Sequence, residues 1–212
     1  TRQSISTRRL EFSFVFEKVP TLAMDPQVAG STRFREIPVV VINGAQSGPC
    51  FWVDGAIHGD EPEGPLACQI AMREIDPAQL SGTVVLVPVM NVPAFEAAQR
   101  GNPLDTFSYD MNRIYPGRAN GYLTERMAAV HAAAMVATAD FEISIHSGGA
   151  HSFLDKAIFV DESPASVELA TAMIVVYVII GPGRWRRQVN RWLIVAAPVV
   201  LVYVAVGWGR QG

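Results

Sequence analysis

Short apolar runs rich in β-branched residues alternate along the chain with segments whose apolar side chains recur at helical spacing. Apolar runs bounded by turn residues predict strands, and the helical spacing predicts helices. The predicted strands are 11–16, 37–42, 50–53, 84–89 and 141–145, and the predicted helices are 66–75 and 123–137. Strands that alternate with helices favour an α/β fold with a sheet covered on both faces.

Residues at the ends of these elements suggest how they connect. Asn43-Gly44 ends the run 37–42, so this run and 50–53 are expected to pair as a hairpin with a longer loop. Thr124 is a candidate cap of the helix 123–137, because its hydroxyl can accept a hydrogen bond from a backbone amide of the first turn. Both expectations concern local geometry alone.

Two polar clusters follow predicted strands directly. AIHGDEPEGP comes after the strand 50–53, and His146-Ser147-Gly148-Gly149 comes after the strand 141–145. In open α/β sheets, ligands bind in loops beyond the carboxyl ends of the strands. We therefore expect the two clusters to meet in space.

Charge and cysteine content narrow the class of protein. The net charge of -3 gives none of the basic footprint that nucleic-acid binding requires. Cys50 and Cys68 are too few for a disulfide framework and are expected to be small core residues. The first 20 residues carry charges throughout and show no signal peptide, which favours a cytoplasmic protein.

The composition changes abruptly near Met173. From Leu169 to Gly212 there is no Asp or Glu, whereas arginines recur. The basic residues there are Arg184, Arg186, Arg187, Arg191 and Arg210. The apolar runs MIVVYVII and LIVAAPVVLVYVAV are shorter than a membrane span requires. Three interpretations stay open: a buried hairpin of core strands, a membrane-associated tail, or residues foreign to the domain, such as a shifted reading frame. We treat 1–172 as the domain and 173–212 as an atypical tail.

His58 and Glu61 stand three residues apart on the loop after the strand 50–53. A tight turn, which Gly59 permits, lets both side chains reach one cation. A hydrolytic zinc ion takes three protein ligands and keeps a fourth position for water, and His146 can supply the third. These three residues are the predicted metal ligands. The competing interpretation is a solvated acidic loop beside an unrelated histidine.

Four further side chains are weaker candidates for a role at this site. Asp60 could accept a hydrogen bond from a ligand imidazole and so orient the ring. Glu63 is expected to be a solvated loop acid. His131, within an Ala-rich helix, is expected to be structural or exposed. His151 could replace a ligand, although a residue lining the pocket is the favoured interpretation.

A second polar motif predicts substrate binding. Asn112 and Arg113 lie on a loop bounded by Pro-Gly, where a guanidinium fork and an amide can bind a carboxylate. The alternative is a turn in which the arginine pairs with Asp110. Arg100 lies between the two motifs in sequence and could polarise a scissile carbonyl and stabilise the developing oxyanion.

Taken together and in this order, the motifs resemble those of the succinylglutamate desuccinylase/aspartoacylase family, a branch of the zinc carboxypeptidase-like hydrolases. The matching pieces are GAIHGDEPEG at 55–64, NVPAF at 91–95, RGNPLD at 100–105, DMNRIYPG at 110–117 and HSGG at 146–149. The similarity covers roughly residues 35 to 172. We therefore expect the fold to be incomplete at its C-terminus.

The resemblance implies a three-layer α/β/α fold with a mixed, mostly parallel sheet and one zinc ion. In matching positions, His58, Glu61 and His146 resemble the metal ligands, and Arg100 resembles the residue that polarises the carbonyl. Asn112 with Arg113 resembles the clamp on the substrate carboxylate. The implied reaction is hydrolysis of the amide of a small anionic N-acylated amino acid by zinc-activated water.

The general base of the family is a glutamate well beyond the third zinc ligand. Here the later glutamates are Glu162 and Glu168, and neither lies in a matching motif. The sequence therefore predicts a zinc site without an assignable base. Four functions stay open: a zinc-dependent deacylase, a zinc-binding but catalytically impaired chain, a membrane-tethered binding protein, and a metallocarboxypeptidase acting on peptides.

Overall fold

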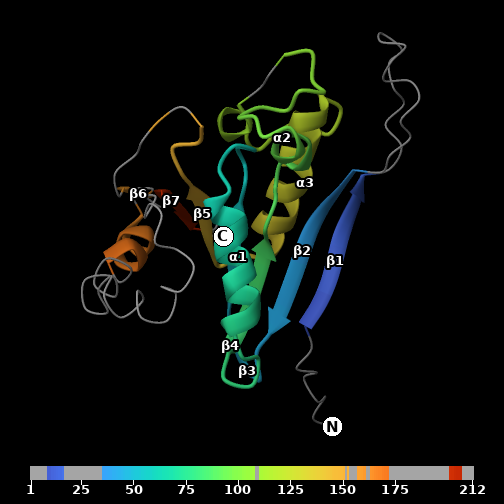
Figure 1. Ribbon diagram of the computed structural model, residues 1–212. Helices are drawn as coiled ribbons and strands as arrows, with labels where there is room; N and C mark the ends of the chain where they lie inside the picture. Colours follow the sequence, from blue (N-terminus) through green and yellow to red (C-terminus); the bar gives the residue numbers. More distant parts are fainter. Residues whose placement is uncertain are drawn as a thin grey trace, which may run out of the picture.

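The computed structural model describes residues 9–16, 35–107, 110–150, 152, 157–160, 163–171 and 201–206. Within these ranges the strands form one seven-stranded sheet in the order β1-β2-β4-β3-β5-β7-β6 (Figure 1). The strands are β1 (Arg9–Phe16), β2 (Arg35–Asn43), β3 (Gln46–Gly55), β4 (Ser81–Val87), β5 (Phe141–His146), β6 (Ala157–Val160) and β7 (Leu201–Val206). The helices are α1 (Glu63–Glu74), α2 (Val92–Glu96), the 3-10 turn η1 (Met111–Arg113), α3 (Leu123–Thr138) and a further helix at 164–171.

The centre of the sheet is parallel and its flanks are mixed. β3 pairs in parallel with both β4 and β5, whereas β2 runs antiparallel to β4 and β7 runs antiparallel to β5. The predicted hairpin of 37–42 with 50–53 is wrong, because β4 lies between β2 and β3. The apolar run of β3 is better buried between two parallel neighbours than it would be at the edge of a hairpin.

Helices α1 and α3 cover opposite faces of the sheet (Figure 1). On one face, Met127 of α3 packs with Trp52 and Val85, and on the other, Cys68 of α1 packs with Leu86. Val85 and Leu86 are adjacent in β4 and contact opposite layers because successive side chains of a strand point to opposite faces. The expected three-layer fold is confirmed.

Both cysteines are free and belong to the central elements. Cys68 is buried in α1, and Cys50 is half-buried on β3. Burial raises the pKa of the Cys68 thiol to about 12, so the side chain stays neutral at physiological pH. The expectation that both are core residues without a disulfide is confirmed.

Part of the atypical tail joins this sheet. Residues 201–206 form β7 between β5 and β6, while the other residues of 172–212 lie outside the described ranges. Among the described residues, no helix combines the length and the apolar character needed to cross a membrane. The domain boundary at 172/173 stays a prediction.

Helix α3 is capped by carboxylates that the sequence pattern did not indicate. Asp105 accepts hydrogen bonds from the backbone amides of Leu123 (3.1 Å) and Thr124 (3.0 Å), and from the Thr124 hydroxyl. Glu125 accepts one from the amide of Tyr122 (2.9 Å). The prediction that Thr124 caps this helix is wrong, since Thr124 is itself within the first turn. Asp105, from a distant loop, accepts hydrogen bonds from amides of the first turn, which have no acceptor within the helix.

Replacing Asp105 with Ala is expected to lower the free energy of unfolding by about 1 kcal/mol, because the first amides of α3 lose their acceptor. Urea denaturation followed by circular dichroism measures this. Glu74→Ala, at an exposed position of α1, serves as the control and is expected to change stability by less than about 0.5 kcal/mol. Equal stability of the two variants would contradict the role of Asp105.

Candidate metal centre

The loop after β3 is fixed to the segment that follows β4. The amide of Met90 donates to the carbonyl of Gly55 (2.9 Å), and the amide of Asn91 donates to that of Ala56 (3.0 Å). The side-chain amide of Asn91 also donates to the carbonyl of Ile57 (3.3 Å). These bonds extend the β3–β4 contact past the strands, so the backbone leading into His58 is held in place.

Close backbone approaches then return the chain to the end of the sheet. A Cβ placed on Gly55 would lie 2.7 Å from the Cα of Gly64, so the start of α1 packs directly against the end of β3. A Cβ on Gly59 would lie 2.0 Å from the carbonyl carbon of Ala94. Only glycine fits at these contacts, and they determine where Glu61 lies relative to His58.

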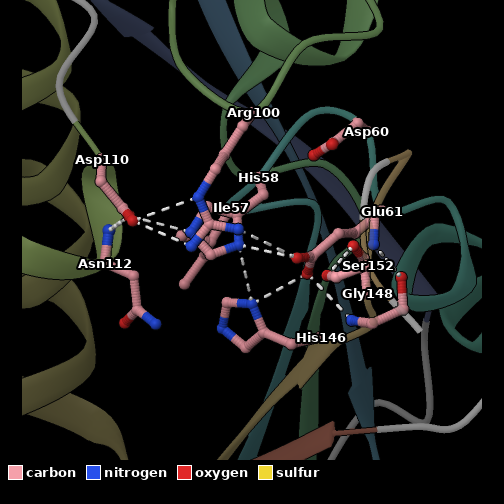
Figure 2. A network of polar contacts seen from close by, with 12 residues as sticks. Ile57, His58, Asp60, Glu61, Arg100, Asp110, Asn112, His146, Gly148 and Ser152 are labelled. Atoms are coloured by element: carbon pink, nitrogen blue, oxygen red, sulfur yellow. Dashed lines mark hydrogen bonds and ion pairs between the residues drawn. The ribbon is translucent and has the colours of Figure 1, made fainter. Parts of the chain in front are cut away.

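The predicted ligands meet at the carboxyl ends of β3 and β5 (Figure 2). His58 Nδ1 lies 2.9 Å from Glu61 Oε1, and His146 Nδ1 lies 3.0 Å from Glu61 Oε2. The two Nδ1 atoms are 3.2 Å apart. All three side chains are buried. The expectation that the two strand-end clusters meet in space is confirmed.

The outer nitrogen of each imidazole has its own partner. His58 Nε2 lies 2.8 Å from Asp110 Oδ1, and His146 Nε2 lies 3.2 Å from the Ser144 hydroxyl. Ser144 donates its proton to Asp54 Oδ1 (2.6 Å), so its oxygen accepts from His146. With Nε2 bonded outward, each ring turns Nδ1 toward Glu61, where it donates a hydrogen bond to the carboxylate or, as the Nε2–H tautomer, offers its lone pair to a cation. Such outer partners orient metal-binding histidines.

Asp60 does not have the orienting role that the sequence suggested. Its Oδ2 accepts a hydrogen bond from the amide of Ala150 (3.1 Å), on the turn after β5. Asp110 and Ser144 already occupy the outer imidazole nitrogens. The prediction is therefore wrong, and Asp60 instead connects the two loops that carry the ligands.

Both carboxylates of the cluster are ionised at neutral pH. Burial raises the pKa of Glu61, but hydrogen bonds with His146, His58 and the Ser147 amide outweigh it and bring the pKa to about 2. For Asp110, burial is outweighed by His58 and Arg100, and the pKa is again about 2. Two imidazole nitrogens and an anionic carboxylate therefore converge, and a cation that replaces the Nδ1 protons would find a complete donor set there.

Arg100 lies at the rim of this cluster. Its guanidinium donates to Asp110 Oδ2 (2.9 Å) and lies 3.6 Å from Glu61 Oε1. Half of its side-chain surface is exposed. The group is thus held beside the buried ligands and remains open to a molecule that approaches from solvent.

The predicted carboxylate clamp lies on η1. The amide of Asn112 donates to Asp110 Oδ1 (3.0 Å), and Figure 2 shows the Asn112 side chain beside Asp110. Arg113 is exposed and donates to the backbone oxygen of Asn112 (3.1 Å). Asp110 pairs with Arg100 and not with Arg113, which leaves the Arg113 guanidinium at the surface next to the cluster.

The remaining candidates lie elsewhere. His131 is one of the buried residues of α3, in agreement with a structural residue. Glu63 is the first residue of α1 and not a loop acid. Glu168 is exposed on the helix 164–171. His151 and Glu162 lie outside the described residues.

Asp54 and Ser144 contact the candidate site, and motif analysis missed them. The alternation of side chains along a strand could have indicated them, because Ser144 shares a face with His146. In the sheet, β3 and β5 pair with Asp54 opposite Ser144. The orienting contact of Asp110 had no comparable signal, because it depends on how the loop between α2 and η1 folds.

Comparison with known proteins agrees with this fold and site. The model of the succinylglutamate desuccinylase/aspartoacylase catalytic domain matches residues 47–180. The chain therefore belongs to the succinylglutamate desuccinylase/aspartoacylase family.

Individual relatives are longer than this chain. An N-alpha-acetyl-L-2,4-diaminobutyric acid deacetylase from Halomonas elongata is 36% identical over 113 residues, which are 53% of this chain and 32% of the relative. A succinylglutamate desuccinylase from Silicibacter sp. TM1040 has a TM-score of 0.63 at 26% identity, over 80% of this chain and 49% of that one. The product-bound ectoine utilization protein EutE (DoeB) from Ruegeria pomeroyi has a TM-score of 0.59 at 32% identity, over 66% and 43%.

Replacing Gly59 with Ala is expected to destabilise the fold by about 1–3 kcal/mol, because the new methyl group overlaps the backbone of Ala94. Urea denaturation measures the change. Gln69→Ala is the control, because it also ends in Ala but only shortens an exposed side chain of α1 and creates no clash. If the Gly59 variant were as stable as this control, the close approach of the two loops would be disproved.

Proposed function

We propose that this chain is the catalytic part of a zinc-dependent hydrolase that cleaves the amide bond of an N-acylated amino acid. The observation that supports this most directly is the convergence of His58, Glu61 and His146. Their donor atoms lie within 4.8 Å of one another, and both outer imidazole nitrogens are already occupied. The proposed hydrolase domain comprises residues 1–172.

The donor set fits zinc. Two imidazoles and one carboxylate are a common set for catalytic zinc, and metal-ligand bonds of about 2.0–2.2 Å place neighbouring donors about 3–3.5 Å apart. The separations between His58, Glu61 and His146 are 2.9, 3.0 and 3.2 Å. When bound, a zinc ion would supply a Lewis acid and lower the pKa of water to about 7.

Arg100 supplies a positive charge beside the reacting bond in this proposal. The Asp110 carboxylate holds its guanidinium, while Glu61 places it next to the ligand set. A guanidinium in this position donates hydrogen bonds to the scissile carbonyl oxygen and stabilises the negative charge that develops on it. Its exposure leaves room for a substrate to reach it.

Asn112 and Arg113 are the proposed contacts of the substrate carboxylate. Arg113 is exposed on η1 and has no carboxylate partner among the described residues, so its fork of donors is available. The printed names of the relatives, a deacetylase of an acetylated amino acid and a succinylglutamate desuccinylase, support a small N-acyl amino acid as the substrate.

No general base is assigned. In the described part of the chain after β5, Glu168 is the only acidic residue, and it is exposed on the helix 164–171. The proposal therefore attributes to the described residues the binding of zinc, the polarisation of the carbonyl and the recognition of the carboxylate.

Replacing Glu61 with Gln is expected to remove one equivalent of zinc per chain, because the only anionic ligand is lost. The effect on affinity should exceed the roughly 10–100-fold typical of losing an outer-shell partner. Metal content measured by mass spectrometry after dialysis tests this. Glu74→Gln makes the same chemical change at an exposed position and should retain zinc. If both variants kept the same zinc content, the proposed ligand set would be wrong.

Replacing Arg100 with Gln is expected to lower kcat about 10²–10³-fold and leave zinc content unchanged, because it removes a charge that acts on the developing oxyanion. Hydrolysis of N-alpha-acetyl-L-2,4-diaminobutyric acid and of succinylglutamate by the zinc-loaded full chain measures the rate. An unaltered chain that binds zinc but hydrolyses neither these nor other N-acyl amino acids would refute the deacylase proposal.

A further inference from the structure

A second group of buried polar side chains lies on the face of the sheet that α3 covers. β3 contributes Asp54 and β5 contributes Glu142, on the same face as Ser144 and His146. The third side chain is His131 of α3, the helix that covers this face, and its ring centre lies 5.6 Å from that of Trp52. This group lies deeper along the strands than the candidate zinc site and shares no ligand with it.

Donor atoms of Asp54, His131 and Glu142 lie within 4.8 Å of one another, and all three residues are buried. Asp54 Oδ2 and His131 Nε2 have no hydrogen-bond partner among the described residues. Asp54 is 0% exposed and His131 is 2% exposed, so bulk water does not solvate these atoms. A buried polar atom without a partner is costly, and His131 Nε2 lacks one whether or not Glu142 shares a proton with Asp54, which points to a missing ligand.

The surrounding residues hold these side chains from the outside. His131 Nδ1 lies 2.9 Å from the hydroxyl of Tyr115, and Asp54 Oδ1 accepts the hydroxyl proton of Ser144 at 2.6 Å. The opposite atom of each side chain, His131 Nε2 and Asp54 Oδ2, is then left for the interior of the cluster. The candidate zinc site has the same pattern, with outer atoms bonded and inner atoms converging.

The charge of the two carboxylates must also be balanced. The two buried carboxyl groups have no ion pair with Lys or Arg among the described residues, and a side-chain hydrogen bond joins Glu142 to Asp54. Either protons or a divalent cation must therefore neutralise the cluster.

We propose that Asp54, His131 and Glu142 form a second metal site that takes a divalent transition-metal ion such as Zn²⁺. One imidazole with two carboxylates is a mixed nitrogen and oxygen donor set that suits such ions. A divalent charge cancels the two carboxylates, and the ion gives Asp54 Oδ2 and His131 Nε2 the partners they lack. The donors need only small inward movements to reach metal-ligand distances of about 2.0–2.2 Å.

Such an ion would join α3 to β3 and β5 from inside the fold. It would also fix Asp54, whose other oxygen holds Ser144, which in turn orients His146. The second site is therefore a structural support for a ligand of the first site, while its own ligands do not touch the proposed substrate position.

The test counts metal ions in the full chain after refolding with excess Zn²⁺ and dialysis. We expect two zinc equivalents in the unaltered chain and one in Glu142→Gln, which keeps the volume of the side chain but removes a ligand charge. We also expect one in the double variant His58→Ala/Glu61→Gln, which lacks two ligands of the first site. Combining all three substitutions should leave none.

A Co²⁺ titration of His58→Ala/Glu61→Gln supplies a second readout that leaves the buried cluster intact. One equivalent of Co²⁺ with visible absorption bands supports the second site. Absence of bound Co²⁺ in this double variant, or a single zinc equivalent in the unaltered chain that Glu142→Gln does not alter, overturns it in favour of protons shared between the carboxylates. The two sets of substitutions change different sites. The metal count of one site can therefore be interpreted even if the other site binds no metal.

Discussion

The parallel pairing of β3 with β5 is the constraint on which the site depends. Their register places Gly55 opposite Ile145, so both strands end at the same edge of the sheet. His58 and Glu61 follow the end of one strand, and His146 is the last residue of the other. A shift of one residue in this register would turn His146 to the opposite face and separate it from Glu61.

The same pairing explains why buried charge accumulates next to the sheet. Glu61 is anionic and buried, and it is stabilised because two imidazoles and the Ser147 amide surround it. A buried carboxylate requires such partners, since desolvation alone would return it to the neutral form. An ion pair between Arg100 and Asp110 lies on the solvent side of the cluster. The geometry of the ligands is thus set by polar contacts that extend from the interior of the sheet to the surface.

Sequence patterns predicted the parts of this structure that depend on local order. Alternation of apolar residues located the central strands and both long helices, and the short spacing of His58 and Glu61 predicted a pair of side chains that do meet. The hairpin was wrong because strand order is set by distant pairing, here the insertion of β4 beside β3. Asp105 and Asp110 act across long stretches of chain, on α3 and His58, so no local motif indicates their contacts.

Charge at the candidate site differs in sign from that of the whole chain. The net charge is -3, yet a divalent ion at the proposed zinc site would be balanced by Glu61 and Asp110. Arg100 would stay paired with Asp110, and Arg113 has no carboxylate partner among the described residues, so the summed charge of the ion and these four side chains would be positive. If the second site is filled as proposed, its ion cancels its own carboxylates and leaves this surplus unchanged. If the substrate is an anionic N-acyl amino acid as proposed, this positive charge would favour its approach to the site.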